Sequence, residues 1–584
     1  MPRHSSRRRV RWSLVALGLV ALLVLGWSGW SWLRDRMGER PGRAECAQGE
    51  TNLKVAVTPS VEQPVREAAN RWNTNRTVVA EHCVQVDVSS VESPAALAGL
   101  AGQWPTRELG DRPDAWLAES TLWTDRLSAT DDALLASAPE SIATSPVVLA
   151  APEPAARLFG GPVGFRWGAL PELTGDTTGW TRFGQPTWGR LTVAIPSPAA
   201  STASALAVQT ALTGVAKQSP ISQQSLARPP VAAALSALVA AQPADVPDST
   251  RSALAKLGET ADMITAPYSA VPALEVDLHR RNLAADGRPA ARRPLFEVVA
   301  AGPGAVADFP YVTLGGGQAD GARDAAADQF RRYLQEPAQQ REFGRAGLRG
   351  TERAEKPPNS LGMTWGEIAP GFVPADRNTA QKIASTWDNA AEGGGIVTIM
   401  VDVSRTMGAD GGDGRSRLDW VKAALDDYTD YTVSGSVGLW PFSHGLDKGK
   451  PYAVAVPTGP VANRRVQLHA AVAALKPAGA TDFSESVAAG YRSAVQGYVP
   501  NRRNQLVVIT DGGADGAMSL GQLKNSIRGL GDKAKPIRVD VIAIGRDANR
   551  ADLRDLANSS GGTLAVLTDA RGVVAALGQA VTAR

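Results

Sequence analysis

The sequence is poor in cysteine and histidine, with two and five of them among 584 residues. It has no His-Glu-x-x-His motif, so nothing in it looks like a zinc-binding catalytic helix. The Gly-x-Ser-x-Gly nucleophile elbow, the P-loop and the dinucleotide-binding glycine fingerprint are also missing. Because these groupings carry much of hydrolysis and nucleotide chemistry, we expect a protein that is not an enzyme. A cell-wall hydrolase is the enzymatic alternative, and the same absences argue against it.

Charge is weak overall and unevenly distributed along the chain. The formal net charge is +3, but residues 1–40 hold eight arginines and two acidic residues, which leaves about −3 for the remainder. The sequence after residue 40 has no basic patch and no nucleic-acid-binding motif. We therefore expect no nucleic-acid partner. The 43% apolar and 20% charged residues indicate a folded chain. Its length favours two or more domains.

The arginine-rich start precedes an uncharged stretch, residues 12–33, that is long enough to cross a membrane as a helix. Three of its tryptophans lie at the far end, where indole rings favour the membrane interface. The positive charge of residues 1–11 predicts a cytoplasmic tail, a single-pass anchor in the cell membrane and an extracellular remainder. The alternative is a cleaved signal peptide, although no small-x-small cleavage site precedes Arg34.

The two cysteines, Cys46 and Cys83, fall early in the part predicted to lie outside the cell. An even pair in an oxidising compartment is most simply one disulfide. The pair lacks the Cys-x-x-Cys spacing of metal and redox sites, so we expect a structural bridge.

Two blocks of alternating strand and helix patterns predict an α/β protein with two folded domains. The first domain spans residues 45–350 and includes strand-like runs at 53–57, 84–88, 145–150 and 190–195. Residues 351–374, rich in proline, glycine and charge, are predicted to be a linker. The second domain, residues 375–584, has the pattern of a doubly wound, Rossmann-like sheet. Its predicted strands are 396–402, 436–442, 505–510, 537–544 and 563–567, and its predicted helices are 416–430, 464–475, 483–497, 519–530, 549–558 and 570–581.

Three short pieces of the second domain look able to hold one divalent cation. They are Asp402-Val403-Ser404-Arg405-Thr406, Gly479-Ala480-Thr481-Asp482 and Ile509-Thr510-Asp511-Gly512. The first and third follow buried strands, so they can meet at one edge of a parallel sheet. Their carboxylates and hydroxyls are the hard oxygen ligands that Mg²⁺ and Ca²⁺ prefer. The alternative is that the hydroxyls of these segments have only a structural role, as caps of turns and helices.

These pieces resemble the metal-ion-dependent adhesion site of von Willebrand factor type A domains, over about 200 residues and with the three motifs in order. The family's Asp-x-Ser-x-Ser stands here as Asp402-Val403-Ser404-Arg405-Thr406, with threonine in the last place. The resemblance implies direct ligation by the hydroxyls of Ser404, Thr406 and Thr481. It also implies water-mediated support from Asp402 and Asp511, with Mg²⁺ or another divalent cation (Ca²⁺ or Mn²⁺) as cofactor. A carboxylate from a protein partner would complete the coordination.

The first domain is similar to periplasmic-type solute-binding proteins, in which two α/β lobes close on a ligand across a cleft. The similarity lies in the order and local sequence of five segments, 113–120, 144–149, 195–198, 264–268 and 308–311. In that fold small ligands sit where strands end and helices begin. By position, the candidate ligand-binding residues are Ser60, Ser89, Ser120, Ser145, Ser197 and Tyr268, although a serine before a helix is usually only its N-cap.

The two resemblances together predict a membrane-anchored cell-surface protein that recognises a partner through the metal site. The alternative is a solute receptor, in which the first domain binds a small ligand for a transporter or a sensor.

Overall fold

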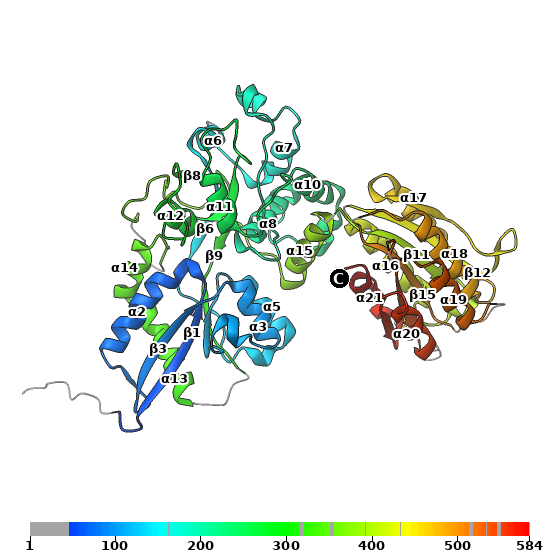
Figure 1. The fold of residues 1–584 in the computed structure, drawn as a ribbon, viewed down its shortest axis with the longest axis horizontal. Coiled ribbons are helices and arrows are strands. Elements are labelled where there is room, and N and C mark those ends of the chain that lie inside the picture. The colour runs from blue at the N-terminus through cyan, green and yellow to red at the C-terminus, as the bar shows by residue number, and fades with distance from the viewer. Residues whose placement is uncertain are drawn as a thin grey trace, which may run out of the picture.

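Figure 1 shows two α/β bodies in the computed structural model, one coloured blue to green and the other yellow to red. The structure describes residues 46–584 except 162–163, 316–320, 351–355, 392, 433, 501, 513–517, 533, 546–549 and 583–584. The predicted tail, residues 1–11, and the predicted membrane helix, residues 12–33, lie outside the described residues. Within the described ranges, no helix has both the length and the apolar character needed to cross a membrane. The predicted α/β class is confirmed by the two bodies.

The first body contains two lobes, and the chain begins in the lobe built on a six-stranded sheet. Its strand order is β2 (Val78–Val79), β3 (His82–Ser90), β1 (Glu50–Val57), β4 (Ala115–Leu117), β10 (Pro310–Thr313) and β5 (Glu140–Ser141). β1 pairs in parallel with β3 and β4, as strand–helix–strand patterns predict, whereas β10 returns antiparallel. The helices of this lobe include α2 (Glu62–Thr74), α3 (Ser93–Ala101), α5 (Thr121–Thr130), α13 (Gly321–Leu334) and α14 (Pro337–Arg345).

The second lobe is built on a smaller sheet in which β6 (Ser145–Pro152) pairs with β7 (Val271–Leu274), β8 (Leu295–Val298) and β9 (Val306–Ala307). All of these pairings are antiparallel, which differs from the parallel units expected from the sequence. The strand expected at residues 190–195 is also wrong, because that segment makes only a single bridge, between Val193 and Ala270. Helices supply most of this lobe: α8 (Thr202–Ala216), α10 (Pro229–Ala240), α11 (Thr250–Gly258) and α12 (Glu275–Asn282).

The segment between the two bodies is bound to the first one over most of its described length. The buried carboxylate of Glu297, on β8, accepts hydrogen bonds from Thr364 and from Trp365 N. Further along, Ala375 N donates to the side chain of Gln209 on α8, at 2.9 Å. The described part of the predicted linker 351–374 is therefore packed along the second lobe.

Helix α15 (Arg377–Ala391) belongs by its packing to the first body, although the second domain was expected to begin at residue 375. Its apolar side chains Ile383 and Trp387 join the core of the first body. Arg377 contacts Ser128 of the first lobe at 3.4 Å, and Asp388 accepts from Ser197 of the second lobe at 2.6 Å. The helix thus touches both lobes immediately before the second body begins.

The second body is a doubly wound sheet with strand order β13 (Lys450–Tyr452), β12 (Ser436–Asp447), β11 (Ile396–Asp402), β15 (Asn504–Thr510), β16 (Arg538–Ile544) and β17 (Leu564–Leu567). β14 (Val456–Pro460) pairs with the outer side of β12. Pairing is parallel from β12 through β17, whereas β13 and β14 run antiparallel to β12 and were not predicted. The helices are α16 (Arg417–Tyr431), α17 (Val461–Ala474), α18 (Phe483–Gln496), α19 (Leu520–Leu530), α20 (Arg550–Asn558) and α21 (Val573–Thr582).

Strand alternation divides the core of this body between the two faces of the sheet. Ile399 and Val401 point to one face, where they pack with residues of α16, α17 and α21. Met400 points to the other face, where it packs with residues of α18, α19 and α20. With both faces covered, the carboxyl ends of the parallel strands form the sheet edge at which loops can build a site.

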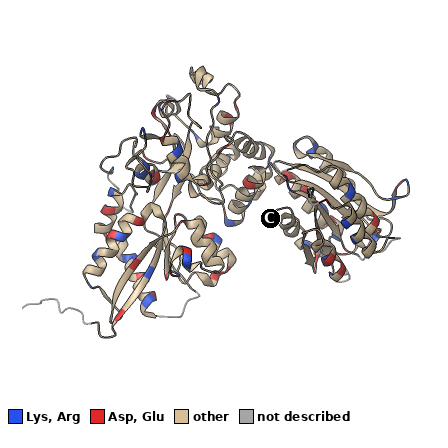
Figure 2. Cartoon of the chain, in the orientation of Figure 1, with Lys and Arg blue, Asp and Glu red and all other residues tan. Residues whose placement is uncertain are grey.

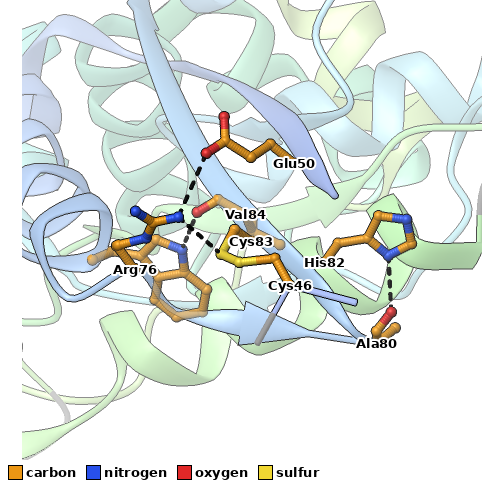
Figure 3. The surroundings of a disulfide bond; sticks show 8 residues. Cys46, Glu50, Arg76, Ala80, His82, Cys83 and Val84 are labelled. Atoms are coloured by element: carbon orange, nitrogen blue, oxygen red, sulfur yellow. Dashed lines mark hydrogen bonds and ion pairs between the residues drawn. A yellow bond between two sulfur atoms is a disulfide. The ribbon is translucent and has the colours of Figure 1, made fainter. Parts of the chain in front are cut away.

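The disulfide predicted between Cys46 and Cys83 is confirmed (Figure 3). It ties the segment before β1 to the beginning of β3, and the two Cα atoms are 5.2 Å apart. Cys83 is buried, and the neighbouring Arg76 forms an ion pair with Glu50 at 3.8 Å. The bridge therefore fixes the start of the first sheet.

Candidate metal centre and interlobe cleft

The candidate metal centre lies where β11 and β15 end, the point at which the strand order of the second body reverses. Successive connections leave these two neighbouring strands toward opposite faces of the sheet, so a crevice forms between them. Asp402 is the last residue of β11, and Asp511 follows the last residue of β15. The fold thus brings together two carboxylates that are far apart in the sequence.

Short hydrogen bonds link the first loop to both carboxylates, through a backbone N–H group at Asp402 and through a hydroxyl at Asp511. Ser404 N donates to Asp402 Oδ1 at 2.8 Å, which folds the loop back over the end of β11. The hydroxyls of Ser404 and Thr406 lie 2.9 Å apart, and Thr406 donates to Asp511 Oδ1 at 2.9 Å. Asp402, Ser404 and Asp511 are buried, whereas Thr406 is exposed and opens the cluster to solvent.

Thr481 reaches the same place on a loop that is fastened to its neighbours through the backbone. Ala478 N donates to Val403 O at 2.7 Å, and Ser443 Oγ donates to Ala480 O at 2.9 Å. Gly479 has φ +70°, and a Cβ there would lie 2.6 Å from Ser443 Oγ, so the close approach requires glycine. A Cβ on Gly512, beside Asp511, would lie 3.3 Å from Thr481 Oγ1. All five predicted metal-site residues therefore gather at one sheet edge.

The environment of Asp402 differs from that of an ordinary surface carboxylate. Burial raises its pKa to about 6, although hydrogen bonds from Thr510 and Ser404 lower it and Asp511 raises it further. Thr510 Oγ1 donates to Asp402 Oδ2 at 2.7 Å, so both oxygens of Asp402 are held by the protein. A carboxylate fixed in this way suits the role of orienting the hydroxyl ligands rather than that of an exposed ligand.

Two residues beside the cluster were missed from the sequence. Arg417 Nη1 pairs with Asp511 Oδ2 at 2.6 Å, and the arginine follows a capping box in which Ser416 and Asp419 satisfy each other's backbone N–H groups. Asp482 is buried, and its Oδ1 has no hydrogen-bond partner among the described residues. The Ser-x-x-Asp pattern predicts where α16 begins, but nothing local predicts that Arg417 reaches across to Asp511.

The hydroxyl and carboxylate oxygens of the five residues are chemically suited to a hard divalent cation. The unpartnered Oδ1 of Asp482, which follows Thr481, also favours such an ion. The described part of the chain has no group of three or more His, Cys, Asp or Glu side chains placed to hold a metal. A metal at this edge would consequently depend on the hydroxyls of Ser404, Thr406 and Thr481. Mg²⁺, which accepts neutral oxygen donors and retains several waters, is compatible with such a set.

Only Ser60, among the six ligand-binding candidates of the first body, lines the cavity between the lobes. Ser120 caps α5 by accepting from Leu122 N, and Ser145 accepts from Val276 N at 3.1 Å. Tyr268 is buried and donates to Ala253 O at 2.7 Å, while Ser197 donates to Asp388 of α15. Ser89 is half-buried near the end of β3. The structure thus gives four of these side chains structural hydrogen bonds away from the cavity.

The interlobe cavity has a volume of about 60 Å³ and is lined by acids that sequence reasoning did not select. Ser60 Oγ lies 3.0 Å from Glu119 Oε1, in the same lobe, and 2.7 Å from Asp277 Oδ1, in the other lobe. Burial and the nearby Asp277 raise the pKa of Glu119 to about 8. Burial also raises the pKa values of Asp277 and Glu92. No sequence motif marks these residues, because they come from separate loops and helices.

Two lobes joined by crossing segments, with a lined cavity between them, define the class of two-lobed binding proteins. Residues 53–349 match the family of bacterial extracellular solute-binding proteins, and the chain belongs to this family. The predicted resemblance of the first domain is therefore confirmed. A family of extracellular proteins implies a secreted or membrane-associated location for this chain.

Relatives extend beyond the first body. Two strains of Mycobacterium tuberculosis each have an uncharacterized protein that is 32% identical over 563 residues, covering 94% of this chain and 79% of the relative. An ABC transporter structure from Clostridium perfringens matches with a TM-score of 0.36 and 12% identity, over 58% of this chain and 98% of that one. A von Willebrand factor type A structure from Catenulispora acidiphila matches with a TM-score of 0.28 and 18% identity, over 32% and 42%. TM-scores below 0.5 do not establish a shared fold, so the second body is described by its own strand order and residues.

Proposed function

We propose that this extracellular binding protein recognises a partner through a divalent cation held by its second body, in the manner of a von Willebrand factor type A domain. One observation carries the proposal. Five oxygen-bearing side chains from three distant loops meet at the strand-order reversal, where open α/β sheets bind ligands. In this proposal residues 12–33 anchor the protein in the cell membrane and the site faces the exterior.

The proposed roles follow from the chemistry of each side chain. Ser404, Thr406 and Thr481 would hold the cation, and Asp402 and Asp511 would orient those hydroxyls and the waters around it. Because the hydroxyls are neutral, a bound cation would keep most of its charge and attract a carboxylate from outside. The exposure of Thr406 favours such access. The partner is therefore expected to present an acidic side chain or a terminal carboxylate.

Calorimetric titration of the full chain with Mg²⁺, and separately with Mn²⁺ and Ca²⁺, tests the metal part of this proposal. We expect saturable binding of one divalent cation per chain and its loss when Thr481 is replaced by alanine. Acetate can then be added as a simple carboxylate probe and is expected to bind only to the metal-loaded protein. Wild-type protein that binds no divalent cation would contradict the proposal.

Replacing Arg417 with glutamine is expected to strengthen Mg²⁺ binding about fivefold. Arg417 contacts Asp511 at 2.6 Å and so places a positive charge beside the proposed cation. Even with the screening of bulk water, charges of +1 and +2 that are about 8 Å apart repel by about 1 kcal/mol. The comparison is made by calorimetry, with R415Q as a matched control because Arg415 is exposed and stacks over Trp420. Weaker Mg²⁺ binding by R417Q would show that Arg417 supports the site instead of opposing the cation.

A second candidate function is favoured by the cavity between the lobes and by the family of the first body. In that function the protein is a solute receptor that hands a small ligand to a transporter or a sensor. The cavity lining of hydroxyls, carboxylates and two arginines favours a small polar ligand over an apolar one. Thermal stabilisation by candidate solutes would identify it, because a ligand that binds only the folded protein raises its stability by mass action.

A further inference from the structure

The two lobes of the first body touch directly through side chains at the cleft. Trp123 Nε1, on α5, donates to Thr202 Oγ1, on α8, at 2.7 Å. Arg251, on α11, pairs with Glu92 of the first lobe at 2.5 Å. The lobes are therefore closed on each other in this structure. The residues that line the cleft contribute to the free energy of this closure.

Closure brings two carboxyl groups from different lobes onto one hydroxyl. Glu119 follows β4 in the first lobe, whereas Asp277 lies in the first turn of α12 in the second lobe. Both are within hydrogen-bond distance of Ser60 Oγ, at 3.0 Å and 2.7 Å. A serine hydroxyl has one hydrogen and can donate to only one of them at a time. The other contact is favourable only if that carboxyl carries a proton and donates to the serine.

The charged groups around this pair offset its charge only in part: burial raises the pKa of Asp277, and the nearby Arg280 and Arg251 lower it without cancelling that rise. Arg251 is already paired with Glu92, and Arg280 donates to the carbonyl oxygens of Pro59 and Ala285. Asp286 adds a further acid to the cavity and is itself paired with the buried Arg281. The groups that face Glu119 and Asp277 are Ser60, Glu92, Thr202, Arg251, Arg280 and Asp286.

We propose that a proton on the Glu119–Asp277 pair favours closure of the lobes, so that lobe closure is coupled to proton uptake. In the open state the two carboxyls separate with their lobes and regain water, and both ionise near their ordinary pKa values. In the closed state two negative charges would share one partly buried site, which is unfavourable without a proton. Two of the segments that cross between the lobes, residues 142–144 and 308–309, are where the movement would be absorbed.

The sign of the pH dependence follows from this difference. The closed state binds the proton more tightly, because the pKa of Glu119 is raised to about 8 there. Closure is therefore favoured at low pH and weakens as the pH rises toward that value. For one coupled proton, the ratio of closed to open molecules falls by up to about tenfold per pH unit between about pH 5 and pH 8. Above this range both states are ionised and the ratio levels off.

The test is a distance measurement on the full chain by energy transfer between two dyes. The dyes are attached through unnatural amino acids at Arg107 in the first lobe and Thr187 in the second, both of which are exposed. We expect the separation in wild-type protein to increase from pH 5 to pH 9 while circular dichroism stays constant. E119Q, in which the pair carries at most one charge, is expected to remain closed at pH 8, and E119Q/D277N to show no pH dependence.

The matched control is E67Q, which removes an exposed carboxylate of α2 in the first lobe and is expected to keep the wild-type profile. D277N provides an independent check if E119Q folds poorly, because neutralising either acid relieves the repulsion. A wild-type separation that does not change with pH would overturn the proposal. So would an E119Q protein that opens over the same pH range as the wild type.

Discussion

Replacing Asp402 with asparagine is expected to weaken Mg²⁺ binding by about 100-fold, the upper end of what loss of an orienting carboxylate costs a metal site. The Asp402 carboxylate accepts a 2.8 Å hydrogen bond from Ser404 N and so positions Ser404. It is fully buried and places a negative charge beside the proposed cation. Asparagine keeps the size and one acceptor oxygen but removes the charge. Calorimetric titration of the full chain gives the affinity directly.

The control for this variant is D410N, which removes the same charge from an exposed position in the loop that follows the site. Asp410 contacts Gly412 N at 3.1 Å and none of the five proposed site residues, so its replacement is expected to leave Mg²⁺ affinity unchanged. Circular dichroism and thermal unfolding check that D402N is folded. A folded D402N with wild-type Mg²⁺ affinity would remove Asp402 from the site.

Replacing Arg349 with alanine is expected to destabilise the first body by about 3–5 kcal/mol, the cost of breaking a buried ion pair from one side. Arg349 binds Glu275 with two hydrogen bonds of 2.8 and 2.7 Å, donates to Gly366 O and stacks over Trp365. Glu275 is fully buried, so the variant would leave its carboxylate without its main partner. Urea unfolding, followed by tryptophan fluorescence, measures the loss in the free energy of unfolding.

The pH dependence of this loss has a definite sign. Burial raises the pKa of Glu275 to about 7 even with Arg349 in place, so without the arginine the carboxyl binds its proton more readily still. The destabilisation of R349A is therefore expected to be smaller at pH 5 than at pH 8. R345A is the matched control, because the Arg345–Glu342 pair is exposed and such pairs contribute less than about 1 kcal/mol. Equal losses in the two variants would contradict the importance of the buried pair.

Two of the five proposed metal-site residues, Asp402 and Asp511, could be placed at one sheet edge from the sequence, because they stand at the ends of buried parallel strands. Strands with a continuous apolar run must lie inside a sheet, and their carboxyl ends then share one edge. This reasoning located the ends of β11 and β15 correctly. It could not locate Arg417 at Asp511, because an arginine reaches several ångströms and its partner is set by tertiary packing.

The first body was less predictable for a related reason. Its second lobe is built from antiparallel strands separated by long helical insertions, so local alternation suggested parallel units that the structure does not contain. The serines chosen by their position before helices proved, with the exception of Ser60, to lie away from the cavity. The cleft acids Glu119 and Asp277 come from different lobes and become neighbours only when the lobes meet.

Helix α15 shows how packing can override a boundary drawn from composition. The proline- and glycine-rich stretch before it suggested that a new domain begins at residue 375. The helix instead buries Ile383 and Trp387 against the first body and reaches both lobes with polar contacts. This helix was not among those predicted from the sequence, and an apolar helix face does not by itself show which body will cover it.

The proposed cation site is tested most directly by crystals of residues 46–584, grown with Mn²⁺ and measured for anomalous scattering. We predict an anomalous peak at the ends of β11 and β15, within bonding distance of the hydroxyl oxygens of Ser404, Thr406 and Thr481. An ordered structure that has no peak at this position in the presence of excess Mn²⁺ would contradict the proposed function of the second body.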